Sequence, residues 1–376
     1  MRIAAISHSC VLPVNQQLFA ELERQDDIEL LLIAPESWKA SLGGATPFSR
    51  LPALQSPVAA LPIRRSGHFA LHSYVGLFDA LADFGPDLVY ADEEPHSLVA
   101  LAAAKEAWKL SARFVFSSKQ NLWRPFPWPF SRIERSVHHD AHGALAVTQA
   151  VGNMLRAKGY RGPLFIVPFA MDPQLFTPNR SPETQAALDR GLPLVGYVGR
   201  LTEEKGLADL IGAAKLAWAR GSAFTLVIIG DGPMRPAIEQ ALADEPADRW
   251  QLVGAVAHDA VADYVSSLDL LVLPSRTGKT WKEQFGRVII EALGCEVPVV
   301  GSDSGHIPHL IETTGGGFIF HERDSEELAL KLQQMLGDEG RRRQMATRGR
   351  EVVLSRYTYA KVAEATAKAF RAICDS

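Results

Sequence analysis

Short apolar runs recur along the chain, and longer stretches with helical periodicity separate most of them. Apolar runs of this length, without alternating polar positions, are typical of strands buried on both faces of a parallel sheet. In the first half we predict strands at 2–7, 28–34, 87–91, 113–116, 144–147 and 164–167. In the second half we predict strands at 194–198, 225–229, 251–253, 270–273, 297–300 and 318–320. The chain is therefore predicted to be an α/β protein with two parallel sheets.

The same pattern predicts the helices and the domain boundaries. Helices are expected at 15–24, 74–84, 95–110 and 149–158, and short strands and loops at 35–65. Residues 168–182 contain four prolines and are predicted to link the two halves. The domains are expected to be 1–170 and 171–356, with a final helix at about 357–376 as a candidate to pack back on the first domain. A cleft between the domains is the expected ligand site.

Composition narrows the class of protein. The 376 residues are 47% apolar and 22% charged, as in soluble globular proteins, and the net charge of −4 gives no reason to expect a nucleic-acid partner. Cys10, Cys295 and Cys374 have no metal-ligand spacing. We see no signal peptide and no apolar run long enough to span a membrane, so we expect a cytoplasmic protein. Peripheral contact with the inner face of the membrane stays open, as does the oligomeric state.

The most informative stretch runs from Asp269 to Leu310. Glu283 lies just before a helix that Gly286 is predicted to open, and Glu291 lies about two turns into that helix. Free N–H groups of Gln284, Phe285 and Gly286 would form an anion site at the helix start. Carboxylates bind hydroxyl groups, so the stretch suits a nucleoside diphosphate sugar. The alternative is a solvated charge at Glu283 and a structural cap at Glu291.

Three turns between a strand and a helix contain glycine at the end of the strand. Gly199 is followed by Arg200 and Lys205, and the two cations are suited to a diphosphate. The alternative is that both cations pair with the acidic residues between them. Gly230 and Gly254 follow two further strands, and either turn alone is a weak signal.

Other kinds of active site find little support. There is no phosphate-binding loop of the Gly-x-x-x-x-Gly-Lys-Ser/Thr type and no Gly-x-Gly-x-x-Gly after the first strand. No Ser/His/Asp or Cys/His arrangement is visible, and no histidine pair has metal-binding helical spacing with a Glu between. We therefore predict no metal site.

Residues 121–135 combine aromatic side chains, prolines and arginines. Such a segment could meet a membrane surface or a lipid-linked acceptor. The simpler interpretation is an irregular loop folded over its own domain.

As a set, the stretches around Gly199–Gly206, Gly230, Gly254 and Ser275, with Glu283 and Glu291 as Glu-x₇-Glu, resemble the retaining GT-B glycosyltransferases of the family-4 type. The resemblance implies two Rossmann-like domains that face each other across a cleft. It also implies that Arg200 and Lys205 hold the diphosphate, that Glu291 binds the ribose and that Glu283 binds the transferred sugar, with Phe285 and Gly286 beside it. Gly254 would lie near the base. No metal ion or other cofactor is expected.

The first half departs from the family's pattern. The family often has a Gly-Gly pair after the first strand, where this chain has Ser9-Cys10. The family's first-domain histidine has no certain counterpart, and His96 and Gln120-Asn121 mark the candidate region. Where the family often has Gly-Gly-x-Pro-Glu, this chain has Gly305-His306-Ile307-Pro308-His309.

The resulting hypothesis is a retaining glycosyltransferase of the hexosyltransferase type. It would move a sugar from a nucleotide-sugar donor to a glycan or lipid-linked acceptor in polysaccharide biosynthesis. The alternatives are a GT-B nucleotide-sugar epimerase and a non-catalytic protein that binds a nucleotide sugar.

Overall fold

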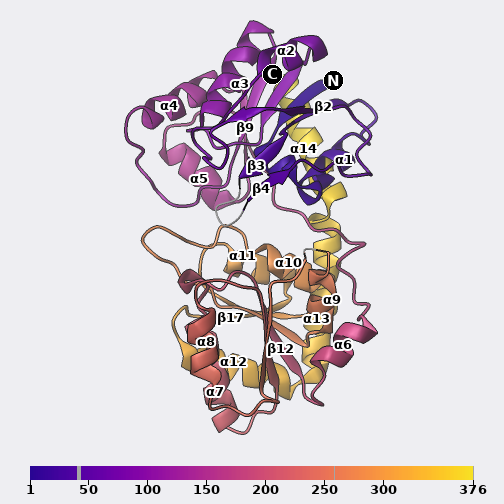
Figure 1. Cartoon of the computed structure of the whole chain (residues 1–376), viewed down its shortest axis with the longest axis vertical. Coiled ribbons are helices and arrows are strands. Elements are labelled where there is room, and N and C mark those ends of the chain that lie inside the picture. Colours follow the sequence, from indigo (N-terminus) through magenta and orange to yellow (C-terminus); the bar gives the residue numbers. More distant parts are fainter. Residues whose placement is uncertain (40–43, 258, 376) are drawn as a thin grey trace. The chain divides into compact units, whose positions relative to one another are not determined.

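The chain divides into two compact units (Figure 1). A computed structural model describes residues 1–39, 44–257 and 259–375. The first unit comprises Met1–Pro168 together with Tyr359–Ser376, and the second comprises Phe169–Thr358. The sequence predicted domain boundaries at 170/171 and at about 356/357, each within two residues of the boundaries in the structure.

The first unit is built on a seven-stranded parallel sheet with the order β11-β10-β9-β8-β1-β2-β5. Its strands are β1 Arg2–Ile6, β2 Glu29–Pro35, β5 Val58–Leu61, β8 Leu88–Ala91, β9 Arg113–Ser118, β10 Gly143–Ala146 and β11 Leu164–Ile166. Two small antiparallel pairs accompany the sheet: β3 Ser37–Lys39 with β4 Ala45–Pro47, and β6 Ile63–Arg64 with β7 Ser73–Tyr74. Residues 40–43, inside the segment predicted as short strands and loops, lie outside the described residues.

Helices fill the connections of the first unit. They are η1 His8–Val11, η2 Pro13–Gln16, α1 Gln17–Leu22, α2 Leu77–Phe84, α3 Leu98–Lys109, α4 Phe130–Asp140, α5 Gln149–Ala157 and α14 Tyr359–Cys374. The last helix, drawn in yellow, lies beside α1 (Figure 1). Its buried face includes Phe370, whose ring centroid lies 5.2 Å from that of Tyr90 on β8.

The second unit is built on a six-stranded parallel sheet with the order β14-β13-β12-β15-β16-β17. Its strands are β12 Leu194–Val198, β13 Thr225–Ile229, β14 Trp250–Gly254, β15 Leu270–Leu273, β16 Val299–Ser302 and β17 Gly317–Phe320. In chain order this is 3-2-1-4-5-6, the strand order of a Rossmann-type sheet.

The helices of the second unit connect these strands. They are α6 Pro182–Leu188, η3 Glu203–Lys205, α7 Leu207–Ala219, α8 Arg235–Leu242, α9 Val261–Ser267, α10 Arg287–Gly294, α11 Ile307–Thr314, α12 Ser325–Gly337 and α13 Glu339–Arg356. No helix among the described residues is long and apolar enough to cross a membrane.

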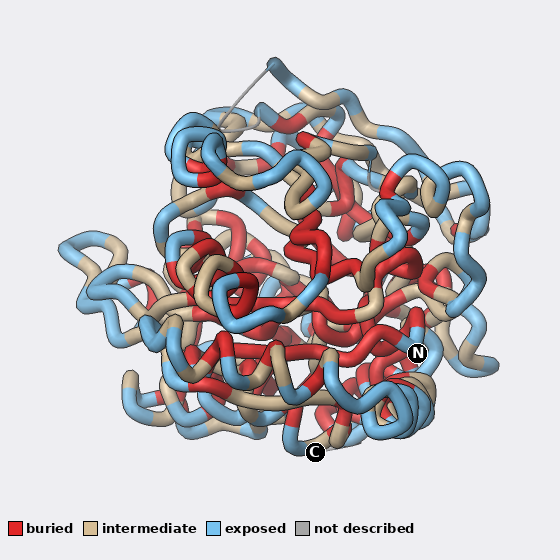
Figure 2. Tube along the Cα trace, turned by 90° about the horizontal axis from the view of Figure 1, so that it is seen from below, coloured by how far each residue is buried: buried red, intermediate tan, exposed pale blue. Residues whose placement is uncertain are grey.

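Alternation along the strands divides the core of the second unit into two layers. Leu271 and Leu273 pack into one hydrophobic cluster, while Leu270 and Val272 of the same strand pack into the other. In Figure 2 buried segments run through the interior of the trace and exposed segments follow its outer loops. Burial of each such aliphatic side chain stabilises the fold by roughly 1.5–3 kcal/mol. Strands buried on both faces therefore consist of apolar residues, and the sequence shows them as short apolar runs.

Several predicted boundaries were wrong. The strand predicted at 297–300 begins at Val299, because the Val297 N–H closes the preceding helix on Ala292 and Pro298 has no N–H to donate. The helix predicted at 15–24 is shorter, since a 3₁₀ turn beginning at Pro13 precedes α1.

Two further helices begin later than predicted. Ser73–Tyr74 forms strand β7, so the helix predicted from 74 begins only after Gly76, which has the left-handed φ of 80°. The helix predicted from 95 begins at Leu98, because the Ser97 side chain accepts a hydrogen bond from the Ala100 N–H and caps it.

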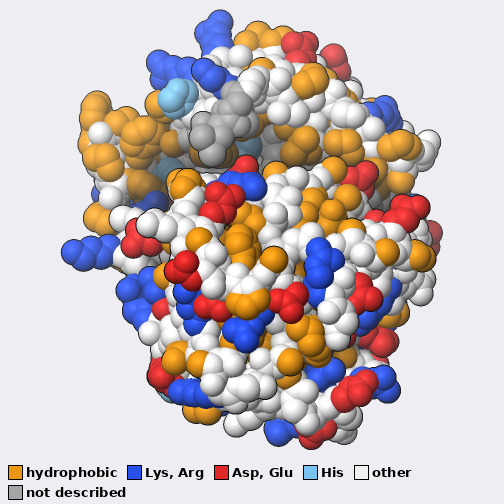
Figure 3. All heavy atoms as spheres, turned by 60° about the horizontal axis from the view of Figure 1, so that its bottom comes forward, with side chains coloured by type: hydrophobic (Ala, Val, Ile, Leu, Met, Phe, Trp, Pro, Cys, Tyr) orange, Lys and Arg blue, Asp and Glu red, His pale blue; other side chains and the backbone are white. Residues whose placement is uncertain are grey.

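On the face shown in Figure 3, Lys and Arg side chains lie among Asp and Glu side chains, and hydrophobic side chains gather at the upper left. Such interspersed charge fits the small net charge of −4.

Candidate functional site

The carboxyl edge of the second sheet brings two loops together. β12 and β15 are neighbours in the sheet, but their connections lead to strands on opposite sides of the pair. Such a switch point leaves a crevice outside the strand ends, where open α/β sheets bind ligands. The loop after β12 contains Gly199 and Lys205, and the loop after β15 contains Ser275 and Glu283.

A sheltered ion pair joins these two loops. Lys205 Nζ lies 2.7 Å from Glu283 Oε2, and the side chains are only 16% and 10% exposed. The Ser275 hydroxyl donates to the same carboxylate oxygen over 2.8 Å. The Lys205 ammonium also lies over the Trp281 ring, 4.7 Å from its centroid. Because both charges are partly removed from water, the pair holds the two loops in a defined relation.

Glycines allow the backbones of the loops to approach closely. Gly206 has a φ of 71°, and a Cβ there would collide with the Pro274 carbonyl oxygen. Gly230 has a φ of 135°, and a Cβ there would collide with the Gly199 carbonyl oxygen. The Gly230 N–H donates to the Gly254 carbonyl over 2.8 Å, so the ends of β12, β13 and β14 are aligned at one edge. The three predicted glycines therefore share this edge.

The start of α10 presents unused backbone donors. Within the described part of the chain, the N–H groups of Gln284, Phe285 and Gly286 have no hydrogen-bond acceptor. Gly286 precedes the helix with a φ of 87°. The Phe285 ring is buried, with its centroid 5.4 Å from that of Phe169. Phe285 can therefore serve a ligand only through its backbone, and the three donors suit an anion.

Glu291 lies deeper along the same helix. Its side chain is buried, and no ion pair of Glu291 occurs among the described residues. Burial raises its pKa to about 7, although the nearby Arg287 opposes the shift. A buried carboxyl of this kind is suited to hydroxyl donors, because each hydrogen bond that it accepts favours the charged form.

Arg200 is not part of the Lys205–Glu283 contact. Its guanidinium is 68% exposed and lies 3.7 Å from Glu204. This surface pair is the alternative considered from the sequence, and it is weak enough for an anionic ligand to displace. The structure therefore brings Lys205 and Glu283 together and leaves Arg200 on the same loop, facing solvent.

Sequence reasoning missed the side chains that brace these loops. Ser275 had no predicted role. Its position after Pro274, at the carboxyl end of a strand, could have marked it as a candidate site residue. Arg276 donates to the Asp209 carboxylate through Nε over 2.6 Å, and its backbone N–H donates to the Glu204 carbonyl over 2.8 Å. No spacing rule links residues 67 positions apart, so only the fold shows that this pair fixes the loop after β15 to α7.

His306 fills space beside the site. Its ring stacks on Phe285 at 5.3 Å and contacts His309 at 4.7 Å. Burial and, to a smaller extent, the nearby His309 lower its pKa to about 4. A neutral, stacked imidazole at this position packs at the start of α11 and carries no positive charge with which to bind an anion.

The candidate region of the first unit is aromatic. His96 stacks on Phe126 at 4.0 Å, and burial lowers its pKa to about 4, with Lys158 and Arg124 adding to the shift. Trp123 and Trp128 in the same loop region are 58% and 79% exposed. The loop is therefore only partly folded over its own domain.

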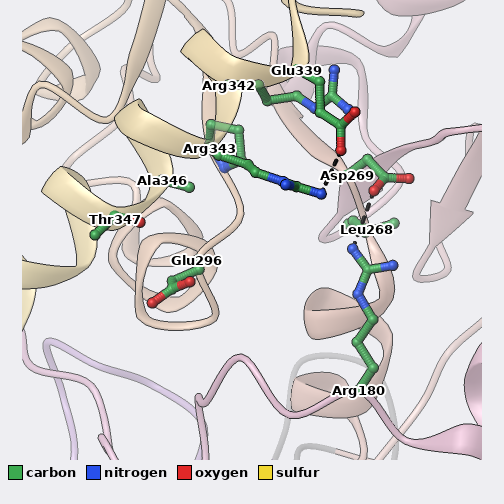
Figure 4. Close-up of a pocket in the computed structure, with 10 residues that line it drawn as sticks. Arg180, Leu268, Asp269, Glu296, Glu339, Arg342, Arg343, Ala346 and Thr347 are labelled. Atoms are coloured by element: carbon green, nitrogen blue, oxygen red, sulfur yellow. Dashed lines mark hydrogen bonds and ion pairs between the residues drawn. The ribbon is translucent and has the colours of Figure 1, made fainter.

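A polar cavity of about 490 Å³ lies at the opposite edge of the second sheet (Figure 4). Asp269 and Pro298, which directly precede β15 and β16, help to line it. Arg180 pairs with Asp269 at 3.1 Å, and Arg343 pairs with Glu339 at 2.6 Å. These charges satisfy one another at the amino ends of the strands, away from the switch point, so the cavity is not the candidate site.

Two family models match the chain in succession. Residues 13–170 match the glycosyl transferase 4-like domain, and residues 182–352 match glycosyl transferases group 1. The chain belongs to the group 1 glycosyltransferases. The predicted resemblance is thereby confirmed, and the second model covers every candidate residue from Gly199 to Glu291.

Curated relatives support the family assignment. The sulfoquinovosyl transferase SQD2 of Arabidopsis thaliana is 32% identical over 295 residues, which cover 73% of this chain and 54% of that protein. The α-D-kanosaminyltransferase of Streptomyces kanamyceticus is 32% identical over 182 residues, covering 48% of this chain and 46% of that protein. The chain thus spans about half the length of these relatives.

Solved structures of other proteins confirm the predicted GT-B class. Anabaena HepE in complex with UDP superposes with a TM-score of 0.75 and 19% identity, covering 99% of this chain and 100% of that one. Sucrose-phosphate synthase from Thermosynechococcus elongatus gives a TM-score of 0.72 and 19% identity, covering 99% of both chains. At this identity the likeness shows the fold, with two parallel-sheet domains in the same chain order.

Proposed function

We propose that this group 1 glycosyltransferase moves a sugar from a uridine diphosphate sugar to a hydroxyl group of a glycan or lipid-linked acceptor in polysaccharide biosynthesis. The observation that carries the proposal is the Lys205–Glu283 pair at the switch point of the second sheet. The pair lies between loops that also supply free N–H groups and a second cation.

The positive groups suit the diphosphate of the donor. Lys205 reaches the pair from the loop after β12, and Arg200 on the same loop faces solvent. The N–H groups before α10 add hydrogen-bond donors and the positive end of the helix dipole. During transfer the bond between the sugar and the diphosphate breaks, and negative charge grows on the leaving nucleotide. Fixed positive groups stabilise that charge.

The two carboxylates suit the hydroxyl groups of the donor. Glu283 accepts hydrogen bonds from Lys205 and Ser275 through one oxygen, and the same carboxylate would also accept hydrogen bonds from hydroxyl groups of the transferred sugar. The buried carboxyl of Glu291 would bind the ribose, and Gly254 at the end of β14 would lie near the base.

The choice of UDP rests on the structural neighbours. Solved structures of Anabaena HepE contain UDP, UDP with glucose, and UDP-glucose. We extend UDP to this chain as a proposal, together with retention of the anomeric configuration. Since cations and amides already face the diphosphate, we expect nucleotide binding to proceed in the presence of a chelator.

Trp123 and Trp128 favour an acceptor at or near a membrane surface. Both side chains are largely exposed, and Arg132 and Arg135 follow in α4. Exposed tryptophan beside arginine is typical of segments that lie at a lipid interface. Co-sedimentation with anionic vesicles, weakened when both tryptophans are replaced by serine, would support this contact.

Calorimetric titration with UDP, GDP, CDP and ADP tests the donor site. We expect UDP to bind the full chain in EDTA, and Lys205→Ala to weaken binding about 10–100-fold, because hydrogen bonds to charged groups contribute roughly 1.5–3 kcal/mol. Lys215→Ala is the matched control, since Lys215 also pairs with a glutamate, Glu245, on the same unit. Equal UDP affinities in the two variants would show that Lys205 does not bind the nucleotide.

Product analysis separates the alternative functions. A transferase releases UDP from UDP-glucose when an acceptor extract is added, and the sugar appears on the acceptor. An epimerase changes the sugar nucleotide without any acceptor, and a binding protein does neither.

A further inference from the structure

The first sheet has a switch point of its own, between β1 and β8. The two strands pair, while their connections lead to opposite sides of the sheet. His8 follows β1, and Glu93 follows β8. His72 precedes β7 and reaches the same place. Three segments that are distant in sequence thus meet outside the carboxyl ends of the strands.

The three side chains form a compact, sheltered cluster. His8 Nδ1 lies 2.6 Å from Glu93 Oε1, and His72 Nε2 lies 3.6 Å from the same oxygen. His72 is fully buried, Glu93 is 2% exposed and His8 is 18% exposed. One ligand atom from each residue lies within 4.8 Å of the other two.

Hydrogen bonding fixes the tautomer of His72. Its Nδ1 lies 3.2 and 3.1 Å from the backbone carbonyl oxygens of His68 and Phe69. Carbonyl oxygens only accept, so Nδ1 must carry the hydrogen. Nε2 is buried and has no hydrogen-bond partner among the described residues. In neutral His72, therefore, a lone pair faces the Glu93 carboxylate.

A lone pair buried against a carboxylate requires a positive charge between them. A proton on Nε2 would supply it, but a charged hydrogen bond closes to about 2.7–2.9 Å, and the gap here is 3.6 Å. Two ligands placed tetrahedrally around an ion at about 2.0–2.1 Å are roughly 3.3 Å apart, which is close to the His72–Glu93 gap. The 2.6 Å between His8 Nδ1 and Glu93 Oε1 is a hydrogen-bond distance, so this pair would have to move apart when an ion enters. Donation of the other ring N–H to backbone carbonyls is also the usual support of a metal-bound histidine.

The surroundings favour a cation as well. Asp92, Glu93 and Glu94 are consecutive, and the described cation that pairs with them is Lys119, 2.9 Å from Asp92. Two aromatic rings lie beside His8: the buried Trp38 at 4.6 Å and Phe69, which is itself 61% exposed, at 5.3 Å from the His8 ring. An excess of negative charge at a site where Glu93 and His72 are buried strengthens attraction to a small cation.

We propose that His8, His72 and Glu93 form a binding site for a divalent transition-metal ion of the zinc class. Two imidazole nitrogens and one carboxylate oxygen are a ligand set that such ions prefer. The ion would replace the proton that His8 Nδ1 shares with Glu93. The partial exposure of His8 leaves access for a fourth ligand, such as water or a hydroxyl group.

This site lies outside the proposed donor site, which the second unit contains. The sequence showed no metal motif because His8 and His72 are 64 positions apart and Glu93 comes from a third segment. Metal binding can be measured without any transferase assay, so failure of one proposal does not decide the other.

The test titrates chelator-stripped full-length protein with Zn²⁺ by calorimetry and with Co²⁺ by visible absorption. We expect equimolar binding and the d–d absorption of four-coordinate Co²⁺. Glu93→Gln and His8→Ala should each weaken binding by at least the roughly 10–100-fold that loss of an outer-shell partner costs. Zn²⁺ should raise the unfolding temperature of the native protein but not that of Glu93→Gln.

His139→Ala is the matched control, because His139 also lies beside a carboxylate, Asp140, at 2.9 Å on the same unit. It should bind Zn²⁺ as the native protein does. If Glu93→Gln does not fold, the partly exposed His8→Ala variant decides the outcome. Substoichiometric binding, or equal binding by native protein and His8→Ala, would overturn the proposal. The positive charge between His72 and Glu93 would then be a proton on His72 Nε2.

Discussion

Glu283 joins two loops of the candidate site, and its proposed second role is to bind the transferred sugar. One carboxylate oxygen accepts hydrogen bonds from Lys205 and Ser275, and we propose that the carboxylate also accepts hydrogen bonds from the transferred sugar. Lys205 in turn depends on Glu283, because an ammonium sheltered from water is costly without its partner. The two residues should therefore behave as a coupled pair rather than as independent contributors.

Replacement of Glu283 tests this role. Glu283→Ala should lower the rate of sugar transfer by about 10²–10³-fold, the cost of removing one preorganised polar group from a reacting centre. Glu245→Ala, which removes the carboxylate from the surface pair with Lys215, should leave the rate unchanged. An unaltered rate in Glu283→Ala, measured as UDP release with acceptor, would remove Glu283 from the site.

The raised pKa of Glu291 predicts a pH dependence of stability. Burial raises its pKa from 4.5 to about 7, so the folded chain binds the proton more tightly than the unfolded chain. The penalty for burying the charge is fully present above pH 7 and disappears as the pH falls toward 4.5, by about 3 kcal/mol at most. Glu291→Gln should therefore stabilise the ligand-free protein at pH 8 but hardly at pH 5, as measured by denaturant unfolding.

Nucleotide binding should show the opposite preference. Ribose hydroxyl groups donate to a carboxylate, so UDP should favour the ionised form of Glu291. Below pH 7 the affinity of the native protein for UDP should fall more steeply than that of Glu291→Gln, whose own affinity is lower. Parallel pH profiles of UDP affinity in the two proteins would contradict contact between Glu291 and the nucleotide.

At the scale of elements, the site depends on how closely two loops approach. Strand order places the loops after β12 and β15 side by side, and Gly206 lets the first loop lie against the Pro274 carbonyl. The Arg276–Asp209 pair holds the second loop to α7. These contacts belong to the loops rather than to the strands, which explains why strand prediction alone did not reveal them.

A pair of glycine substitutions separates close approach from backbone strain. Gly206 and Gly191 have φ values of 71° and 70°, so alanine at either position costs roughly 1 kcal/mol or more of strain. Only at Gly206 would the new Cβ also collide with backbone. Gly206→Ala should therefore weaken UDP binding at least about tenfold, while Gly191→Ala should lower stability with little change in affinity. Equal UDP affinities, by calorimetry, would contradict this account.

At the scale of the whole molecule, the chain returns to its first unit after completing the second. Helix α14 follows the last residue of the second unit, yet its apolar face is buried within the first. A Cβ at Gly143 would collide with the Ile373 side chain, so β10 and α14 are packed without spare room. The stability of the first unit therefore depends on the final eighteen residues.

Truncation of one side chain on α14 tests that dependence. Phe370→Ala should destabilise the first unit by about 3–5 kcal/mol, because it leaves a cavity against Tyr90. Hydrogen exchange should accelerate in β8 and β10 but not in β12 and β15. Lys368→Ala, an exposed change on the same helix, should alter neither. Faster exchange throughout both units would show that they unfold together.

The sequence by itself determined the architecture and supplied most residues of the candidate donor site, whose role stays a prediction. Buried parallel strands must be apolar on both faces, so each appears as a short run, and the order of runs and helices gave the α/β class. Glycines at strand ends and the spacing of Glu283 and Glu291 are local features. They could be read without knowledge of distant contacts.

Only the tertiary structure decided which side chains meet. It paired Lys205 with Glu283, left Arg200 with Glu204, and buried the ring of Phe285. It also assembled His8, His72 and Glu93 at the edge of the first sheet. The physical reason is that strand order in a parallel sheet joins residues that the chain separates by tens of positions, and no spacing rule encodes that order.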